Sequence, residues 1–212
     1  MKASDLPKAL GEVRALAKRY LSGTPDAFDA TRELLNFLLR STVMDDREHV
    51  RFLSIPETQR RNTKTIGNRL QPVPLNDGHF LRLVVNLSLD PIEGEQAKLR
   101  VYSAAFQYQL DKEGEQWVFR YDYVRVPNNE HPASHLQMRA NLLSDACLPP
   151  HTPLERLHFP TGRVTMEAVI RLLAEQFKVP CNESGDIWRP LLAESEREFE
   201  RIAHRHISGP AE

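Results

Sequence analysis

The sequence predicts an α+β protein in which an antiparallel meander sheet of four to five strands is flanked by two N-terminal and two C-terminal helices. Three observations support this prediction. Apolar and polar residues alternate strictly over residues 79–90, as in a half-buried strand. A glycine-containing turn at residues 111–115 joins two further alternating runs. Both ends of the chain carry apolar stripes at helical spacing.

The size and composition of the chain indicate one globular domain over residues 1–212. A chain of 212 residues can bury a sizeable core. Its 41% hydrophobic and 27% charged residues are typical of globular proteins and unlike those of disordered ones. The formal net charge of -1 excludes a strong overall attraction to nucleic acid. Any polyanion site must therefore be a local patch.

Cysteine usage and the start of the chain predict a cytoplasmic protein. The two cysteines, Cys147 and Cys181, are interpreted as reduced thiols rather than as a disulfide framework. The first residues lack the apolar core of a signal peptide. No segment approaches the ~20 apolar residues that span a bilayer. We therefore expect no membrane partner.

Two helices are expected in residues 1–41. Ser4 can cap the first helix, and Pro7 suits its first turn. The run Ser22-Gly23 ends it, and residues 24–26 supply a cap, a proline and an acid for the next helix. The apolar stripes of this helix pair would cover the sheet, or bind a protein partner or a second copy of the chain.

The sheet is expected within residues 79–160. Its strands would cover residues 79–90, 99–110, 117–126, 134–142 and, as a short fifth strand, 154–159. Most turns between them are too short for a parallel crossover, so an antiparallel arrangement is expected.

Residues 42–78, before the sheet, are the least regular part of the chain. A short strand is expected at residues 50–55, followed by a polar, basic stretch at residues 57–69. That stretch is either a solvated loop or an arm that contacts phosphates.

Two further helices are expected in residues 164–206. Thr165 can cap the first, and Pro180 ends it. Asp186 can cap the second, with Pro190 tolerated in its first turn. Acids and bases follow at i,i+3 and i,i+4 spacing over residues 194–206, as on an exposed helix.

Strand parity gathers titratable side chains on one face of the expected sheet. The aromatic residues of the third strand share the apolar face: Trp117, Phe119, Tyr121 and Tyr123. Arg120 and Asp122 then lie on the opposite face, where antiparallel pairing brings them near His135 and Arg139. Pairing of the fifth strand would add Arg156 and His158.

The residues of this polar face suit general acid–base catalysis on a phosphodiester. His135 and His158 are the candidate acid and base, with Asp122 to orient an imidazole or pair with an arginine. The candidate phosphate-binding residues are Arg120, Arg139, Arg156 and Arg163. Arg163 also precedes a helix start, where backbone N–H groups favour an anion. Because an RNA 2′-hydroxyl can act as the internal nucleophile, no metal or other cofactor is expected.

Other interpretations stay open. The same face could be a solvated surface of cross-paired charges without any function. A transition metal could be held by His131, His135 and His158, with Asp122 or Glu130. Cys147 with the nearby His151 could be a catalytic pair, although a lone loop cysteine is more often incidental. Gly-rich nucleotide-binding loops, Gly-x-Ser-x-Gly and His-Glu-x-x-His are absent from the sequence.

The order Phe119-Arg120-Tyr121-Asp122, then His131-Pro132-x-x-His135 and a later helix, resembles that of small bacterial toxins of the TumE type, which belong to toxin–antitoxin modules. The resemblance covers about a quarter of the chain. The chain departs from it at Leu136 and Gln137, where that group has a dense histidine cluster, and by its two N-terminal helices. The resemblance implies an RNA-directed or translation-blocking role, carried by Arg120, Asp122, His131 and His135.

The leading hypothesis from the sequence is therefore a bacterial nucleic-acid-acting protein, specifically a metal-independent ribonuclease of toxin type. The alternative is a non-catalytic component that binds a protein partner, or itself, through the N-terminal helices. A small-molecule or metal enzyme is a third interpretation. The sequence alone does not decide between an enzyme and a binding protein.

Overall fold

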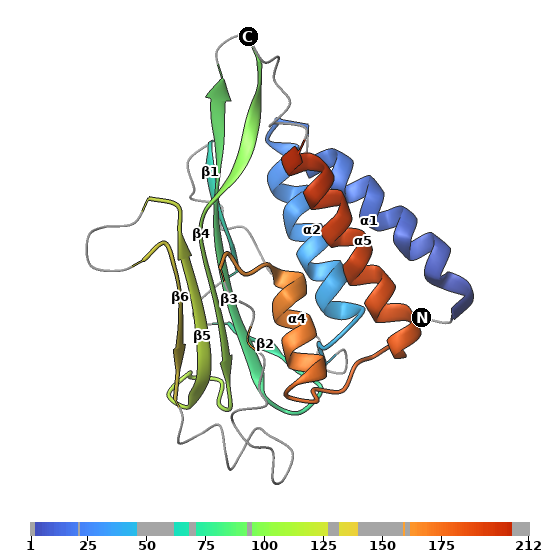
Figure 1. Cartoon of the computed structure of the whole chain (residues 1–212), viewed down its shortest axis with the longest axis vertical. Coiled ribbons are helices and arrows are strands. Elements are labelled where there is room, and N and C mark those ends of the chain that lie inside the picture. Colours follow the sequence, from blue (N-terminus) through green and yellow to red (C-terminus); the bar gives the residue numbers. More distant parts are fainter. Residues whose placement is uncertain are drawn as a thin grey trace.

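Helices cover one face of an antiparallel sheet in a computed structural model of the chain, which describes residues 3–20, 22–45, 62–67, 71–92, 95–126, 132–139, 159 and 162–204 (Figure 1). This is the predicted α+β class. In chain order the elements are a 3₁₀ turn Ala3–Asp5, α1 Leu6–Tyr20, α2 Asp26–Arg40, β1 Thr63–Gly67, β2 Val73–Pro74, β3 Phe80–Ile92, β4 Glu95–Gln109, β5 Trp117–Val124, β6 Ser134–Met138, α4 Met166–Glu175 and α5 Gly185–His204.

The sheet has the strand order β1-β3-β4-β5-β6, with β2 paired to the start of β3, and every pairing is antiparallel. Strands β3 to β6 form the meander that alternation predicts. Strand β1 forms within residues that we predicted to be a polar loop or arm. Its pairing with β3 stabilises it, whereas its own five residues carry no strand pattern. The expected strand at residues 50–55 lies outside the described residues, and of residues 154–159 only Phe159 is described.

The four helices among the described residues lie near the expected positions, with differences at their starts. The Thr165 side chain caps α4 by accepting a hydrogen bond from the Ala168 amide at 3.3 Å, as predicted. Helix α2 begins at Asp26 without a side-chain cap, and the Thr24 hydroxyl instead lies 2.8 Å from the Ser22 hydroxyl. Helix α5 begins at Gly185, so Asp186 lies inside the helix and does not cap it, and Pro190 lies about two residues further into the helix than expected.

The hydrophobic core lies between the sheet and the helices. Strand β3 contributes its alternate leucines at positions 81, 83 and 87, all at most 1% exposed. The rings of Tyr108, Phe119 and Phe177 pack against each other, with centroids 5.2–5.7 Å apart. Burial of these apolar side chains is the main favourable contribution to folding. The polar face of the sheet therefore turns away from the helices.

Two register shifts in the sheet change which side chains share a face. The shift between Asn86 and Leu87 leaves Tyr102 opposite no residue of β3, and Tyr102 is 50% exposed although its parity with Ala104 predicts burial. The shift after Tyr108 leaves Val118 opposite no residue of β4, so Trp117 pairs with Gln109. Alternation predicts that Trp117 shares the apolar face with Phe119. The register shift places Trp117 on the polar face instead.

No helix in the described part of the chain combines the length and apolarity needed to cross a membrane.

Candidate functional site

Strands β5 and β6 form the candidate site on the polar face of the sheet. Asp122 lies opposite His135 and Arg120 opposite Gln137 in the antiparallel register. This is the pairing that alternation across residues 127–133 predicts, and it is confirmed. Because neighbouring side chains of a strand alternate between faces, Arg120, Asp122 and His135 emerge together.

Asp122 holds two basic groups through one carboxylate oxygen. Arg120 donates a hydrogen bond from Nε to Asp122 Oδ2 at 2.6 Å, and His135 Nε2 lies 3.5 Å from the same oxygen. The side chains are 38% exposed for Arg120, 18% for Asp122 and 22% for His135. The contact with His135 is longer than a hydrogen bond but within the range of an ion pair. A carboxylate in this place orients the imidazole.

Basic side chains outnumber acidic ones around this pair. Two rows of paired residues run from β3 to β6 here, Arg82-Gln107-Arg120-Gln137 and Val84-Ala105-Asp122-His135. Together with Arg139, which follows β6, they carry three arginines and one acid. Arg82 donates to the carbonyl of Glu113 at 2.7 Å, and Arg139 to that of Glu115 at 2.6 Å. The face is therefore locally basic in a chain whose net charge is -1.

Trp117 adds an aromatic ring to the same face. The guanidinium carbon of Arg139 lies 4.9 Å from the centre of the indole, in a cation–π contact. Sequence reasoning missed Trp117 as a member of this face, because the register shift at Val118 reverses its parity and the strand sequence carries no signal of that shift.

Arg163 is not brought to the other candidate residues. Its guanidinium carbon lies 5.0 Å from the ring centre of Tyr123, which pairs with Ala104 on the helix-facing side of the sheet. The remaining candidates, His131, Arg156 and His158, lie outside the described residues. The second histidine of the expected acid–base pair is thus not placed.

The residues considered for metal binding and for a cysteine site are placed only in part. No three histidine, cysteine or acidic side chains gather into a metal site among the residues with described positions. His131, Glu130 and His158 lie outside those residues, as do Cys147 and His151. Cys181 is described as a half-buried thiol, and burial raises its pKa to about 11. Such a thiol is a poor nucleophile at neutral pH.

No protein family model, no curated protein and no solved structure matches this chain. The site is therefore interpreted from its own geometry.

Proposed function

We propose that the protein acts on RNA through the polar face of the sheet, with His135 as an acid–base group and the arginines around it as phosphate ligands. The observation that supports this most is the shared Asp122 carboxylate, which lies next to both the Arg120 guanidinium and the His135 imidazole. A phosphodiester placed at this point would meet an oriented imidazole and a guanidinium held in place.

Phosphate binding follows from the three arginines of the face. Guanidinium groups bind phosphate oxygens through paired, charge-assisted hydrogen bonds. Arg120 pairs with Gln137, and Arg139 follows the last residue of β6 at the same end of the strand pair. Arg82 continues the row of Arg120 across Gln107 of β4. Trp117 supplies a surface on which a base could stack, and base stacking is a common feature of single-strand recognition.

Cleavage would use the RNA itself as the nucleophile. A base removes the proton of the 2′-hydroxyl, the 2′-oxygen attacks the adjacent phosphorus, and the bond from phosphorus to the 5′-oxygen breaks as an acid protonates that oxygen. The products are a 2′,3′-cyclic phosphate and a 5′-hydroxyl. His135 would fill one of these two roles, with His158 as the candidate for the other. The resemblance to TumE-type toxins supports the same class of substrate.

The test is cleavage of a single-stranded RNA oligonucleotide in the presence of EDTA. We expect cyclic-phosphate ends, and no cleavage when every ribose carries a 2′-O-methyl group. His135→Ala should lower the rate about 100-fold, because general acid–base catalysis contributes on that scale. Gln137→Ala, the next outward position of β6, is the matched control and should retain the rate. Full cleavage by His135→Ala would overturn the catalytic role.

RNA binding is measured separately by fluorescence anisotropy at two salt concentrations. Arg120→Gln and Arg139→Gln should weaken binding and flatten its salt dependence, because each removes one phosphate contact. Arg189→Gln, which removes an exposed guanidinium from α5, is the control for charge alone. RNA affinity that both variants of the polar face leave unchanged would contradict the proposed surface.

The alternative function, association through the N-terminal helices, would need exposed apolar side chains on α1 or α2. Among the described residues, the large apolar side chains that are exposed are Tyr102, Val126 and Met138, and all three lie in or next to the sheet. This observation favours the sheet over the helix pair as the surface for an interaction.

A further inference from the structure

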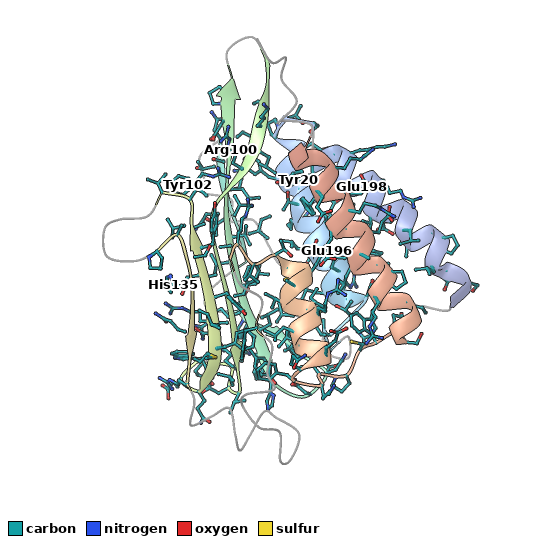
Figure 2. All side chains as sticks on the ribbon, in the orientation of Figure 1. Tyr20, Arg100, Tyr102, His135, Glu196 and Glu198 are labelled. Atoms are coloured by element: carbon teal, nitrogen blue, oxygen red, sulfur yellow. The ribbon has the colours of Figure 1, made fainter. Side chains whose placement is uncertain are left out.

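A groove lies on the opposite side of the sheet from the polar face, between the strands and the helices. Its volume is about 1000 Å³, and residues from α1, α2, β3, β4, β5, α4 and α5 line it. This volume is at the upper end of the range for small-molecule sites, about 300–1,000 Å³. Tyr20, one of the helix residues that line it, is labelled in Figure 2. No described residue of the proposed catalytic site borders this groove.

The walls of the groove are mainly apolar. On the helix side they include Leu35, Met166 and Phe199, and on the sheet side Ala104 and Phe106. Side chains of this kind bind an apolar body well because its transfer from water is favourable. They disfavour RNA, whose charged backbone would lose its hydration there.

Two arginines and a tyrosine supply the polar part of the groove. Arg125 follows β5, Arg163 precedes α4, and Tyr20 ends α1. Burial raises the pKa of the Tyr20 hydroxyl, the positive charges of Arg163 and Arg125 oppose this shift, and the charge of Glu167 adds to it. Within the described residues, the Tyr20 hydroxyl makes no hydrogen bond, although its ring packs edge-on against Phe199 at 5.1 Å.

The two arginines of the groove form no ion pair with a carboxylate of the described residues. Neither Arg125 nor Arg163 has a carboxylate partner in the described structure: Arg125 donates to the Val101 carbonyl at 3.1 Å, and Arg163 lies over the Tyr123 ring. The charged residues that border the groove are Lys98, Arg100, Arg125, Arg163, Glu167 and Glu200. Burial raises the pKa of Glu167, which weakens its contribution as a counter-charge.

We propose that this groove binds an amphipathic anion with an apolar chain and a single carboxylate or phosphate head group. The apolar body lies against Leu35, Phe106 and Phe199, and the head group lies between Arg125 and Arg163. The Tyr20 hydroxyl donates to the same oxygen atoms. The argument is charge complementarity: two cations without acidic partners lie beside apolar walls, where a charge-assisted hydrogen bond is stronger than in water. The proposal is independent of RNA cleavage.

Calorimetry of the full chain tests this with palmitate and with dodecyl phosphate, each below its micelle concentration. We expect one site per chain, and the tighter of the two identifies the preferred head group. Dodecyltrimethylammonium, which keeps the chain and reverses the charge, should bind at least about 100-fold more weakly. Absence of binding by both anions, or equal binding of the cation, would overturn the proposal.

Four variants locate the site. Arg125→Gln and Arg163→Gln should each weaken anion binding about tenfold, since each removes a charge-assisted hydrogen bond. Tyr20→Phe should weaken it by a smaller factor, because the hydroxyl is neutral. Arg189→Gln, at a guanidinium paired with Glu175 outside the groove, should not change it. Unchanged affinity in the Arg125→Gln, Arg163→Gln double variant would contradict the assignment.

A further variant separates this site from the polar face. Ala104→Trp fills the sheet side of the groove and should abolish binding of palmitate or dodecyl phosphate while both arginines remain. Thermal unfolding shows whether the variant is folded, and the arginine variants decide the matter if it is not. RNA cleavage by a folded Ala104→Trp protein should be unchanged, so that failure of one proposal is distinguishable from failure of the other.

Discussion

Asp122 lies directly opposite His135 in the β5–β6 pair, and its Oδ2 atom also accepts the hydrogen bond of Arg120. We predict that this carboxylate contributes only modestly to stability, because the Arg120 side chain is 38% exposed and the pair is screened by solvent. Asp122→Asn should lower the free energy of unfolding by about 0.5–1 kcal/mol. Urea denaturation measures this change.

A double-mutant cycle isolates the interaction. Asp122→Asn and Arg120→Gln, alone and together, should show a coupling free energy that shrinks in high salt. A destabilisation several times larger would mean that the cluster serves the fold rather than RNA, and would count against the proposed site.

Asp77 forms a tighter polar cluster at the start of β3. The Tyr108 hydroxyl donates to Asp77 Oδ2 at 2.7 Å, the His79 amide donates to Oδ1 at 3.0 Å, and His79 Nδ1 lies 3.0 Å from Oδ2. Burial of this carboxyl acts to raise its pKa, but the hydrogen bonds from His79 and Tyr108 outweigh burial and hold the pKa below its ordinary value.

The sign of the pH dependence follows from this depressed pKa. The unfolded chain binds a proton at Asp77 more readily than the folded one, so the contribution is complete above the ordinary Asp pKa of about 4 and is lost as the pH falls through the folded pKa. Asp77→Asn should therefore cost about 1–2 kcal/mol at neutral pH and less in acid. Urea denaturation of both proteins at several pH values measures this, and a cost that does not change with pH would contradict it.

Residue patterns predict much of the fold and part of the site. Alternation along β3 and β5 predicts the sheet, and it also predicts the pairing of Asp122 with His135, because period and register are local properties of strands. Alternation fails at Tyr102 and Trp117, since a register shift inserts one residue without changing the composition of the strand.

The groove could not be predicted from sequence patterns, for a different reason. Tyr20 and Arg163 come from opposite ends of the chain and approach only when α1 and α4 pack over the sheet. From the sequence we grouped Arg163 with the other arginines because it precedes a helix start. The sequence does not indicate which face of the sheet this helix start lies against. An arginine at a helix start indicates anion binding, but it does not indicate which residues surround the anion.

Gly67 is predicted to be intolerant of a side chain. It ends β1 with φ +84, and an added Cβ would collide with the backbone carbonyl of Leu83 in the neighbouring strand. Gly67→Ala should therefore destabilise the protein by about 2–4 kcal/mol, through backbone strain and steric overlap together. Gly78 is the matched control, because it has the same φ but open space around it. Gly78→Ala should cost only about 1–2 kcal/mol, and equal costs in thermal unfolding would show that the contact with Leu83 has no effect.

Glu167 is predicted to destabilise the protein when it is charged. Its carboxyl is buried in the first turn of α4 and accepts a hydrogen bond from the Ser195 hydroxyl at 2.5 Å. Burial raises the pKa of this carboxyl, and the hydrogen bond from Ser195 only partly opposes the shift. The folded chain therefore holds the proton more tightly than the unfolded chain, and stability falls as the pH rises from about 4 through the folded pKa.

Glu167→Gln tests this, since the amide oxygen can still accept the Ser195 hydrogen bond but carries no charge. The variant should gain about 1 kcal/mol above neutral pH, where the buried carboxylate carries its full desolvation cost, and should equal the native chain in acid. Ser195→Ala should instead lose about 1 kcal/mol, because it leaves a buried acceptor without its donor. Denaturation curves between about pH 4 and pH 8 measure both. A loss of stability in Glu167→Gln at high pH would mean that the fold favours the charged form, and would contradict this prediction.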